Sequence, residues 1–264
     1  MKRLENKVAV VYGAGGIGGA IAKAFAKEGA KIFLTGRTAT KLDVIAGEIL
    51  SDGGAIETAK LDALDERAVE EHMLETVNKA GKIDISFNAI GGILQKDIEN
   101  IPLTELPLES FLLPITTYTQ SHFVTARAAA RRMVRQGQGV IVMHTPNASR
   151  ISPSFIGGLA PAWAAMEALC RSLSVECGQS GVRAVCLLTT SIPETPLMEE
   201  VWKSRAKARS ITVEQFRSMA EGMTHRHRLT TLEELTNAAI FVASEEGSAI
   251  TGTIVNLTAG MIAG

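Results

Sequence analysis

Three glycines near the amino end have the spacing of a phosphate-binding turn. Gly13, Gly15 and Gly18 complete the pattern G-x-G-x-x-G directly after an apolar run and at the start of a helical pattern. Glycines so placed let the backbone approach a pyrophosphate, whose charge the helix N-terminus stabilises. The pattern predicts a dinucleotide site formed by Gly13, Gly15, Gly16, Ile17 and Gly18. The alternative is a glycine-rich turn that binds nothing. No Gly-Lys-Ser/Thr follows, which excludes a Walker-type loop.

One arginine bears on the choice between the two nicotinamide dinucleotides. A carboxylate at the end of the second strand would bind an adenosine ribose and repel a 2′-phosphate. This chain instead has Arg37 there, between Gly36 and Thr38. The planar guanidinium of Arg37 suits a phosphate group, so the position predicts NADP rather than NAD. The alternative is an exposed arginine that only ends a strand.

The elements that must position these residues follow from hydrophobic periodicity. The expected strands are 7–12, 31–35, 56–61, 83–89, 140–145, 183–189 and 253–257. The expected helices are 18–29, 39–51, 66–79, 108–135, 161–177 and 232–243, with Pro114 as a kink or late start. Alternating apolar strands and helices indicate a parallel sheet covered on both faces. We expect one α/β domain over 1–264, a doubly wound Rossmann-type fold with a mainly parallel sheet of about seven strands.

Composition excludes several classes of protein. Of 264 residues, 46% are hydrophobic and 21% charged, as in ordinary globular proteins. A formal net charge of −1 and 5% aromatic residues give no reason to expect a nucleic acid or a membrane surface as partner. No apolar stretch approaches the roughly 18 residues that a membrane span needs. Three cysteines without a C-x-x-C pair, and no secretory segment, predict a reduced, cytoplasmic protein without a metal site.

Several further segments, together with the glycine turn, resemble the short-chain dehydrogenase/reductase family over nearly the whole chain. They are Leu61-Asp62, Phe87-Asn88-Ala89-Ile90-Gly91, residues 168–183, Thr195-Pro196-Leu197 and residues 233–260. The resemblance implies a nicotinamide cofactor that Asp62, Asn88 and Thr195 help to bind. It also implies a homodimer or homotetramer built on the two long helices at 108–135 and 161–177. One departure is Tyr12, which replaces the threonine of the family's glycine turn, and the turn is one residue shorter.

The four side chains of the family's chemistry are missing at the positions where the resemblance places them. The family uses a Tyr as acid and base, a Lys four residues later, a Ser before the Tyr and an Asn on the long helix. Ungapped counting puts Leu159, Trp163, Pro146 and Tyr118 at these four positions. No Lys occurs between residues 119 and 166, so a small shift in register restores nothing. A phenol titrates near pH ~10 without a cationic neighbour, so the family mechanism of carbonyl reduction is in doubt.

Three residues are candidates for the missing chemistry. Tyr118 would supply a phenol from the opposite wall of the pocket, or it fills the space of the missing Asn. His144 titrates near neutrality in its unperturbed state, or it is a satisfied core histidine. Thr145 can hydrogen-bond a substrate oxygen.

Residues 191–228 form a polar excursion that the resemblance implies to be a substrate lid. Its part from 201 to 228 has seven basic and two acidic residues, a formal charge of +5. A basic lid favours an anionic substrate, whereas the alternative is a pair of solvated amphipathic helices.

Three functions are consistent with these patterns. The first is an NADP(H)-dependent oxidoreductase with an atypical active site, acting on a small carbonyl or a conjugated enone. The second is a non-catalytic NADP-binding sensor or partner subunit. The third is a non-redox cyclase or isomerase that uses Tyr118, His144 or Thr145.

Overall fold

A parallel sheet forms the centre of the computed structural model, which describes residues 2–91 and 100–263. Within the described residues the sheet has seven strands in the order β3-β2-β1-β4-β5-β6-β7, and each neighbouring pair is parallel. The strands are β1 (Val8–Tyr12), β2 (Lys31–Gly36), β3 (Ala55–Lys60), β4 (Ile85–Asn88), β5 (Gly139–Pro146), β6 (Val182–Thr189) and β7 (Thr253–Leu257). The predicted fold class is confirmed.

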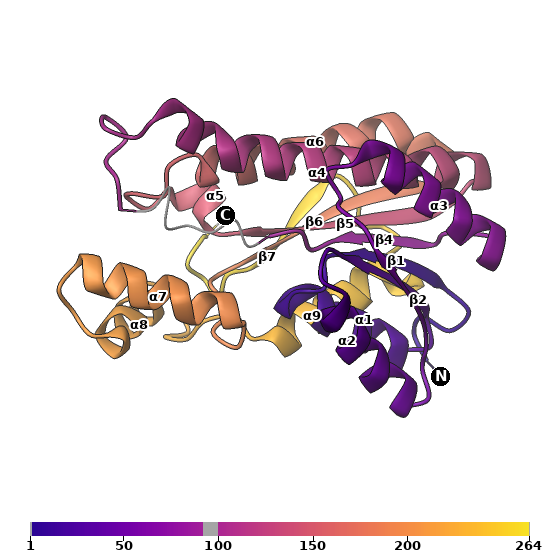
Figure 1. Cartoon of the computed structure of the whole chain (residues 1–264), viewed down its shortest axis with the longest axis horizontal. Coiled ribbons are helices and arrows are strands. Elements are labelled where there is room, and N and C mark those ends of the chain that lie inside the picture. The colour runs from indigo at the N-terminus through magenta and orange to yellow at the C-terminus, as the bar shows by residue number, and fades with distance from the viewer. Residues whose placement is uncertain (1, 92–99, 264) are drawn as a thin grey trace.

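Helices cover both faces of this sheet (Figure 1). One layer contains α1 (Gly16–Lys27), α2 (Ala39–Ser51) and α9 (Leu232–Ala243). The opposite layer contains α3 (Glu66–Ala80), α4 (Leu108–Gln136) and α6 (Leu159–Cys177). A short α5 (Ala148–Ile151) follows β5, and α7 (Pro196–Ala208) and α8 (Val213–Gly222) project beyond the layers. Two short 3-10 helices, η2 (Gly178–Ser180) and η3 (Glu245–Gly247), complete the described elements.

Two buried clusters hold the layers together because side chains of a strand alternate between its faces. On β1, Ala9 and Val11 join the cluster under α1, α2 and α9. Val8, Val10 and Tyr12 join the cluster under α3, α4 and α6. Buried apolar side chains of this kind each contribute roughly 1.5–3 kcal/mol to folding, so the sheet is held rigidly between its helices.

The strand order reverses between β1 and β4, which places a crevice at their carboxyl ends. Ligands of open α/β sheets bind at this kind of switch point. The chain segments that leave β1, β4, β5 and β6 all start from this edge of the sheet. The glycine turn and the candidate catalytic residues therefore belong to one edge.

Most predicted elements begin and end within two residues of the observed ones. Pro114 lies inside α4 and does not start it, and it is buried against the turn before α6. The first helix begins at Gly16, two residues earlier than predicted. Helices α5, α7 and α8 were not predicted individually. In the part of the chain that the structure describes, no helix combines the length and apolar character needed to cross a bilayer.

Candidate functional site

The glycine turn joins β1 to α1 in a space that only glycine fits at two positions. Gly13 has a φ of +105°, and a Cβ on it would lie 2.8 Å from the carbonyl oxygen of Ala89. A Cβ on Gly18 would lie 1.7 Å from the carbonyl oxygen of Gly13. These two glycines are therefore needed for α1 to start directly beside β1 and β4.

The start of α1 is open and has the properties of an anion site. Gly15 is the N-cap, no side chain caps the helix, and its first turn contains no acidic residue. Gly15 and Gly16 are exposed and Ile17 is half-buried. A Cβ on Gly15 would meet no atom within 4 Å, whereas one on Gly16 would lie 3.2 Å from the Thr195 side chain. Unpaired amide groups at such a helix end suit the pyrophosphate of a dinucleotide.

Two polar residues flank the far end of this crevice. Arg37 follows β2 and Asp62 follows β3, and these strands are neighbours in the sheet. Arg37 is exposed and makes no hydrogen bond or ion pair with any described residue. Asp62 is exposed, and its Oδ1 accepts a hydrogen bond from the Leu64 amide at 3.0 Å. One cation and one carboxylate are thus available at the predicted adenosine end.

The Asn88 side chain makes structural hydrogen bonds at the end of β4. Its buried Nδ2 donates to Thr125 Oγ1 at 2.8 Å and to the Ser121 carbonyl at 3.3 Å. Its Oδ1 accepts from the Ile90 amide at 2.8 Å. The side chain holds α4 to the turn after β4 and shapes the crevice through these contacts.

An apolar wall is formed by the three residues that the sequence resemblance predicts at the family's Asn, Lys and Tyr positions. Tyr118 on α4 and Trp163 on α6 meet edge to face, with ring centroids 6.0 Å apart. Leu159 is 0% exposed and packs in the same cluster with Ile156 and Ala148. Trp163 and Tyr118 are 7% and 8% exposed. The wall therefore offers mainly aromatic and aliphatic surface.

His144 and Thr145 lie on opposite faces of β5. His144 Nε2 is 2.8 Å from Thr189 Oγ1, and burial lowers the pKa of His144 to about 4. The imidazole is therefore neutral at pH 7. Thr145 is 0% exposed, and its hydroxyl lies 3.3 Å from Cys186 Sγ. Because they face opposite sides of the sheet, His144 and Thr145 do not act together from one face of β5.

Two separate groups of contacts beside β5 involve residues outside the predicted site. Asn147 donates from Nδ2 to Met261 Sδ at 2.6 Å. Glu167 on α6 accepts from Ser149 Oγ at 2.5 Å and from Arg150 Nε at 2.6 Å, and its side chain is 4% exposed. Helical spacing could have marked Glu167 because it shares a buried face with Trp163. No local pattern marks Met261.

The basic residues of the excursion are largely paired. Lys203 binds Glu199 at 2.5 Å, and Arg217 binds Glu221 at 2.7 Å, both at a spacing of four along a helix. Arg228 binds Glu234 through two contacts. Counted over all of 191–228, seven basic residues face five acidic ones. The local positive potential is therefore weaker than the charge of 201–228 alone indicates.

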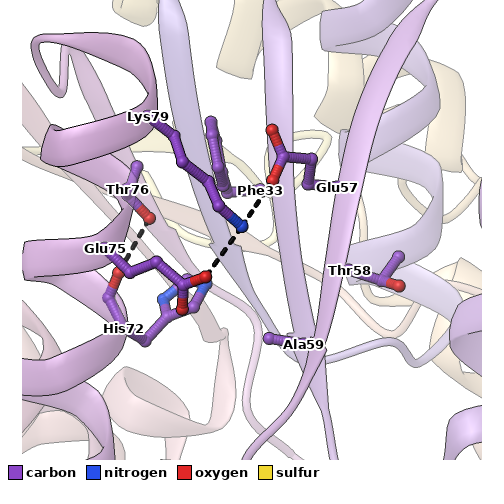
Figure 2. Close-up of a pocket in the computed structure, with 8 residues that line it drawn as sticks. All are labelled: Phe33, Glu57, Thr58, Ala59, His72, Glu75, Thr76 and Lys79. Carbon is purple, nitrogen blue, oxygen red and sulfur yellow. Dashed lines mark hydrogen bonds and ion pairs between the residues drawn. The ribbon is translucent and has the colours of Figure 1, made fainter.

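A small cavity of about 30 Å³ lies away from this edge, between α3 and strands β2 and β3 (Figure 2). Lys79 bridges Glu57 at 2.9 Å and Glu75 at 2.7 Å at its rim. His72 lines it, and burial lowers the pKa of that imidazole. Its volume is enough for a water molecule and too small for a substrate.

The fold and the glycine turn together define the class of dinucleotide-binding α/β proteins. The chain belongs to the short-chain dehydrogenase/reductase family of oxidoreductases, since a family model described as "Enoyl-(Acyl carrier protein) reductase" matches residues 13–262. No group of three or more His, Cys, Asp or Glu among the described residues is placed to hold a metal ion.

Known proteins of this family are similar over nearly the full length. A 7alpha-hydroxysteroid dehydrogenase of Clostridium sardiniense is 27% identical over 271 residues, which covers 100% of this chain and 96% of that protein. A solved 7 alpha-hydroxysteroid dehydrogenase complexed with NADH and 7-oxo glycochenodeoxycholic acid is 25% identical, with a TM-score of 0.84 and coverage of 98% and 95%. The solved NAD+-bound xylitol dehydrogenase is 23% identical, with a TM-score of 0.90 and coverage of 98% and 100%, and shows the same fold.

Two glycine variants separate folding from phosphate binding. We expect Gly18→Ala to lower the free energy of unfolding by about 2 kcal/mol or more, because its Cβ overlaps the Gly13 carbonyl. We expect Gly15→Ala to fold normally and to bind NADPH about tenfold more weakly, since a methyl group enters the open space of the turn. Thermal unfolding and NADPH fluorescence titration measure the two effects. Unchanged NADPH affinity in Gly15→Ala contradicts the assigned phosphate site.

Acid pH is expected to destabilise the protein through buried imidazoles. Burial lowers the pKa of His122, like that of His144, to about 4, whereas histidines of the unfolded chain titrate near ~6.5. Between these values only the unfolded state binds the proton, so stability falls as pH decreases from ~6.5 to ~4. His122→Asn should remove about 3 kcal/mol of this dependence, measured by urea unfolding across pH. The exposed His227→Asn change serves as control; equal pH slopes in both variants contradict the explanation.

Proposed function

We propose that the protein is an NADP(H)-dependent oxidoreductase that reduces a carbon–carbon double bond conjugated to a carbonyl in a small molecule. The observation that carries this proposal is the apolar wall of Leu159, Trp163 and Tyr118 at the family's proton-transfer positions. A saturated ketone needs a positioned acid when hydride adds to it. A conjugated enone needs less help from an acid, because the negative charge left after hydride addition is delocalised onto oxygen as an enolate.

The pKa values of the nearby groups also favour a conjugated enone over a saturated ketone as the substrate. Burial keeps His144 and His122 neutral at pH 7, with pKa values near 4. Tyr12 lies under α3 and α4, where burial raises the pKa of its phenol. Burial also raises the pKa of the Cys186 thiol. None of these groups is an acid poised near neutrality, so the reaction must proceed with neutral hydrogen-bond donors.

The residues around the crevice fit a nicotinamide dinucleotide. The open start of α1 would hold the pyrophosphate, and Thr195 would border it beside Gly16. Arg37 would pair with a 2′-phosphate and Asp62 would lie at the adenine. When bound, NADPH supplies the hydride. The description of the matching family model as an enoyl reductase supports the choice of a conjugated double bond.

A non-catalytic NADP-binding protein is the second candidate. The same apolar wall favours it, because Trp163 fills the place from which the family's Lys holds the nicotinamide ribose. Such a protein would bind NADPH tightly without turnover, as a sensor or as a partner subunit.

Further parts of the proposal concern assembly, access and location. Phe123 on α4 and Val175 on α6 are 47% and 83% exposed, and we propose that these two helices pair in a homodimer or homotetramer. Residues 191–228 would act as the substrate lid. The free, buried Cys170 and Cys186 suit a reducing, cytoplasmic location.

Arg37 should determine cofactor preference. We expect Arg37→Asp to raise the ratio of the NADPH to the NADH dissociation constant by about a hundredfold, since a carboxylate replaces the phosphate-binding cation and repels the 2′-phosphate. Fluorescence titration with each dinucleotide measures the ratio. Lys27→Asp makes the same charge change at the other end of α1 and should leave the ratio unchanged. A ratio that moves equally in both variants contradicts the role of Arg37.

The reaction is tested with matched pairs of enones and saturated ketones. We expect NADPH absorbance to fall with 2-cyclohexen-1-one and similar enones, and at least about a hundredfold more slowly with cyclohexanone, because only the enone avoids the need for a strong acid. Product analysis should show a saturated ketone. Equal rates with both substrates contradict the proposed reaction. Tight NADPH binding without consumption by either substrate supports the second candidate instead.

A further inference from the structure

Asn147 occupies a distinctive place at the carboxyl end of β5. It follows Pro146, the residue at the position of the family's Ser, and its amide N–H donates to the Thr189 carbonyl at 2.7 Å. The residue is therefore tied to the ends of both β5 and β6, at the edge where open α/β sheets bind ligands. Its neighbour Ala148 packs in the apolar wall with Trp163 and Tyr118.

The side-chain amide of Asn147 has one N–H group that no described residue accepts. An amide nitrogen carries two hydrogens, and Nδ2 of Asn147 uses one toward Met261 Sδ at 2.6 Å. No other described residue accepts a hydrogen bond from this nitrogen. Sulfur is a weak acceptor, so the contact orients the amide without satisfying it.

Met261 reaches Asn147 because the chain after β7 is held in a tight turn. Ala259 and Gly260 have φ values of +53° and +87°, and a Cβ on Gly260 would lie 2.7 Å from His225. Asn256 Nδ2 donates to the Ile262 carbonyl at 2.7 Å. The Ile262 amide donates to Thr258 Oγ1 at 3.1 Å. These contacts fix the backbone from which the Met261 side chain extends toward Asn147.

The other side of Asn147 is equally restrained. The buried Glu167 carboxylate accepts hydrogen bonds from Ser149 at 2.5 Å and Arg150 at 2.6 Å. These contacts attach α5, which begins one residue after Asn147, to α6. The backbone at Asn147 is thus held by β6 and by the contacts of the following residues with α6, and its side chain by the carboxyl-terminal turn. Donors that are fixed before reaction stabilise developing charge without a cost of reorganisation.

We propose that Asn147 is a catalytic residue whose free Nδ2–H binds the carbonyl oxygen of the substrate, and that Met261 is its positioning residue. The inference rests on the proposed enone reduction. In that reaction the substrate's β-carbon gains a hydride from NADPH, which is oxidised to NADP⁺, and the electron pair of the double bond moves onto the carbonyl oxygen. The α-carbon then takes a proton from water, and the carbonyl re-forms. Asn147 stabilises the oxygen while it is negative.

Kinetics of Asn147 variants test this role. We expect Asn147→Ala to lower kcat for 2-cyclohexen-1-one about a hundredfold, the effect typical of losing one such donor, with the KM for NADPH unchanged. Met261→Ala should lower kcat about tenfold because the amide loses its orientation, and Met261→Leu should restore most of it by refilling the space. A kcat of Asn147→Ala within twofold of the parent overturns the assignment. An equal loss in Met261→Leu and Met261→Ala overturns the positioning role.

A binding measurement tests the donor role of Asn147 without requiring turnover. Phenolate oxygen resembles an enolate oxygen, so 4-nitrophenolate should bind the NADP⁺-loaded protein, and Asn147→Ala should weaken this binding about tenfold, or about 1.4 kcal/mol. Absorbance titration at a pH above the phenol's pKa measures it, with thermal unfolding as a check on folding. If the parent reduces no enone but phenolate binding depends on Asn147, the proposed reaction fails and the donor role stands. Phenolate binding that is absent or is unaffected by Asn147→Ala overturns the donor role.

Discussion

The close contact between the start of α1 and the first turn after β1 is the constraint on which the site depends. A Cβ at Gly18 would come within 1.7 Å of the Gly13 carbonyl oxygen, and one at Gly13 within 2.8 Å of the Ala89 carbonyl oxygen. Without side chains at these positions, α1 begins at the crevice between β1 and β4 and leaves its first amide groups open. The same contact sets the end of β4, where Asn88 then binds α4. The predicted phosphate end and the predicted substrate end of the crevice are therefore built on one glycine-dependent junction.

The residues predicted at the family's catalytic positions make physical sense as a group. A phenol without a cationic neighbour titrates too high to act near neutrality, so a Tyr without its Lys has little use in proton transfer. A Lys without polar partners would in turn be costly to bury beside Leu159, which has no exposed surface. In this chain the rings of Trp163 and Tyr118 contact each other directly and pack with Leu159 in one cluster. Such a wall suits the apolar substrate surface of the proposed reaction.

Hydrophobic periodicity was sufficient to predict the sheet and most helices, and the spacing of the glycines was sufficient to predict the glycine turn. Both signals depend on residues close in sequence. The i, i+4 spacing of Glu199 and Lys203 also indicates an ion pair on a helix. The formal charge of +5 was counted over 201–228 and therefore leaves out Glu199. Met261 could not be predicted from its surroundings in sequence, because its contact with Asn147 spans 114 residues and depends on the turn after β7. Glu167 is intermediate: its helical face is predictable, whereas its partners on α5 depend on tertiary packing.

The neutral charge state of the buried histidines at this edge limits how a developing negative charge can be stabilised there. Burial favours the neutral forms of two histidines near this edge, so His122 and His144 stay uncharged well below neutral pH. A neutral site can stabilise negative charge only through oriented dipoles, and such dipoles are effective when they are held rigidly before the charge develops. The restraints on Asn147 from Thr189, Met261 and the α5–α6 contact meet that condition. An enolate, whose charge is spread between carbon and oxygen, needs less stabilisation from such donors than the localised alkoxide from a saturated ketone, and this difference is the basis of the proposed enone reduction.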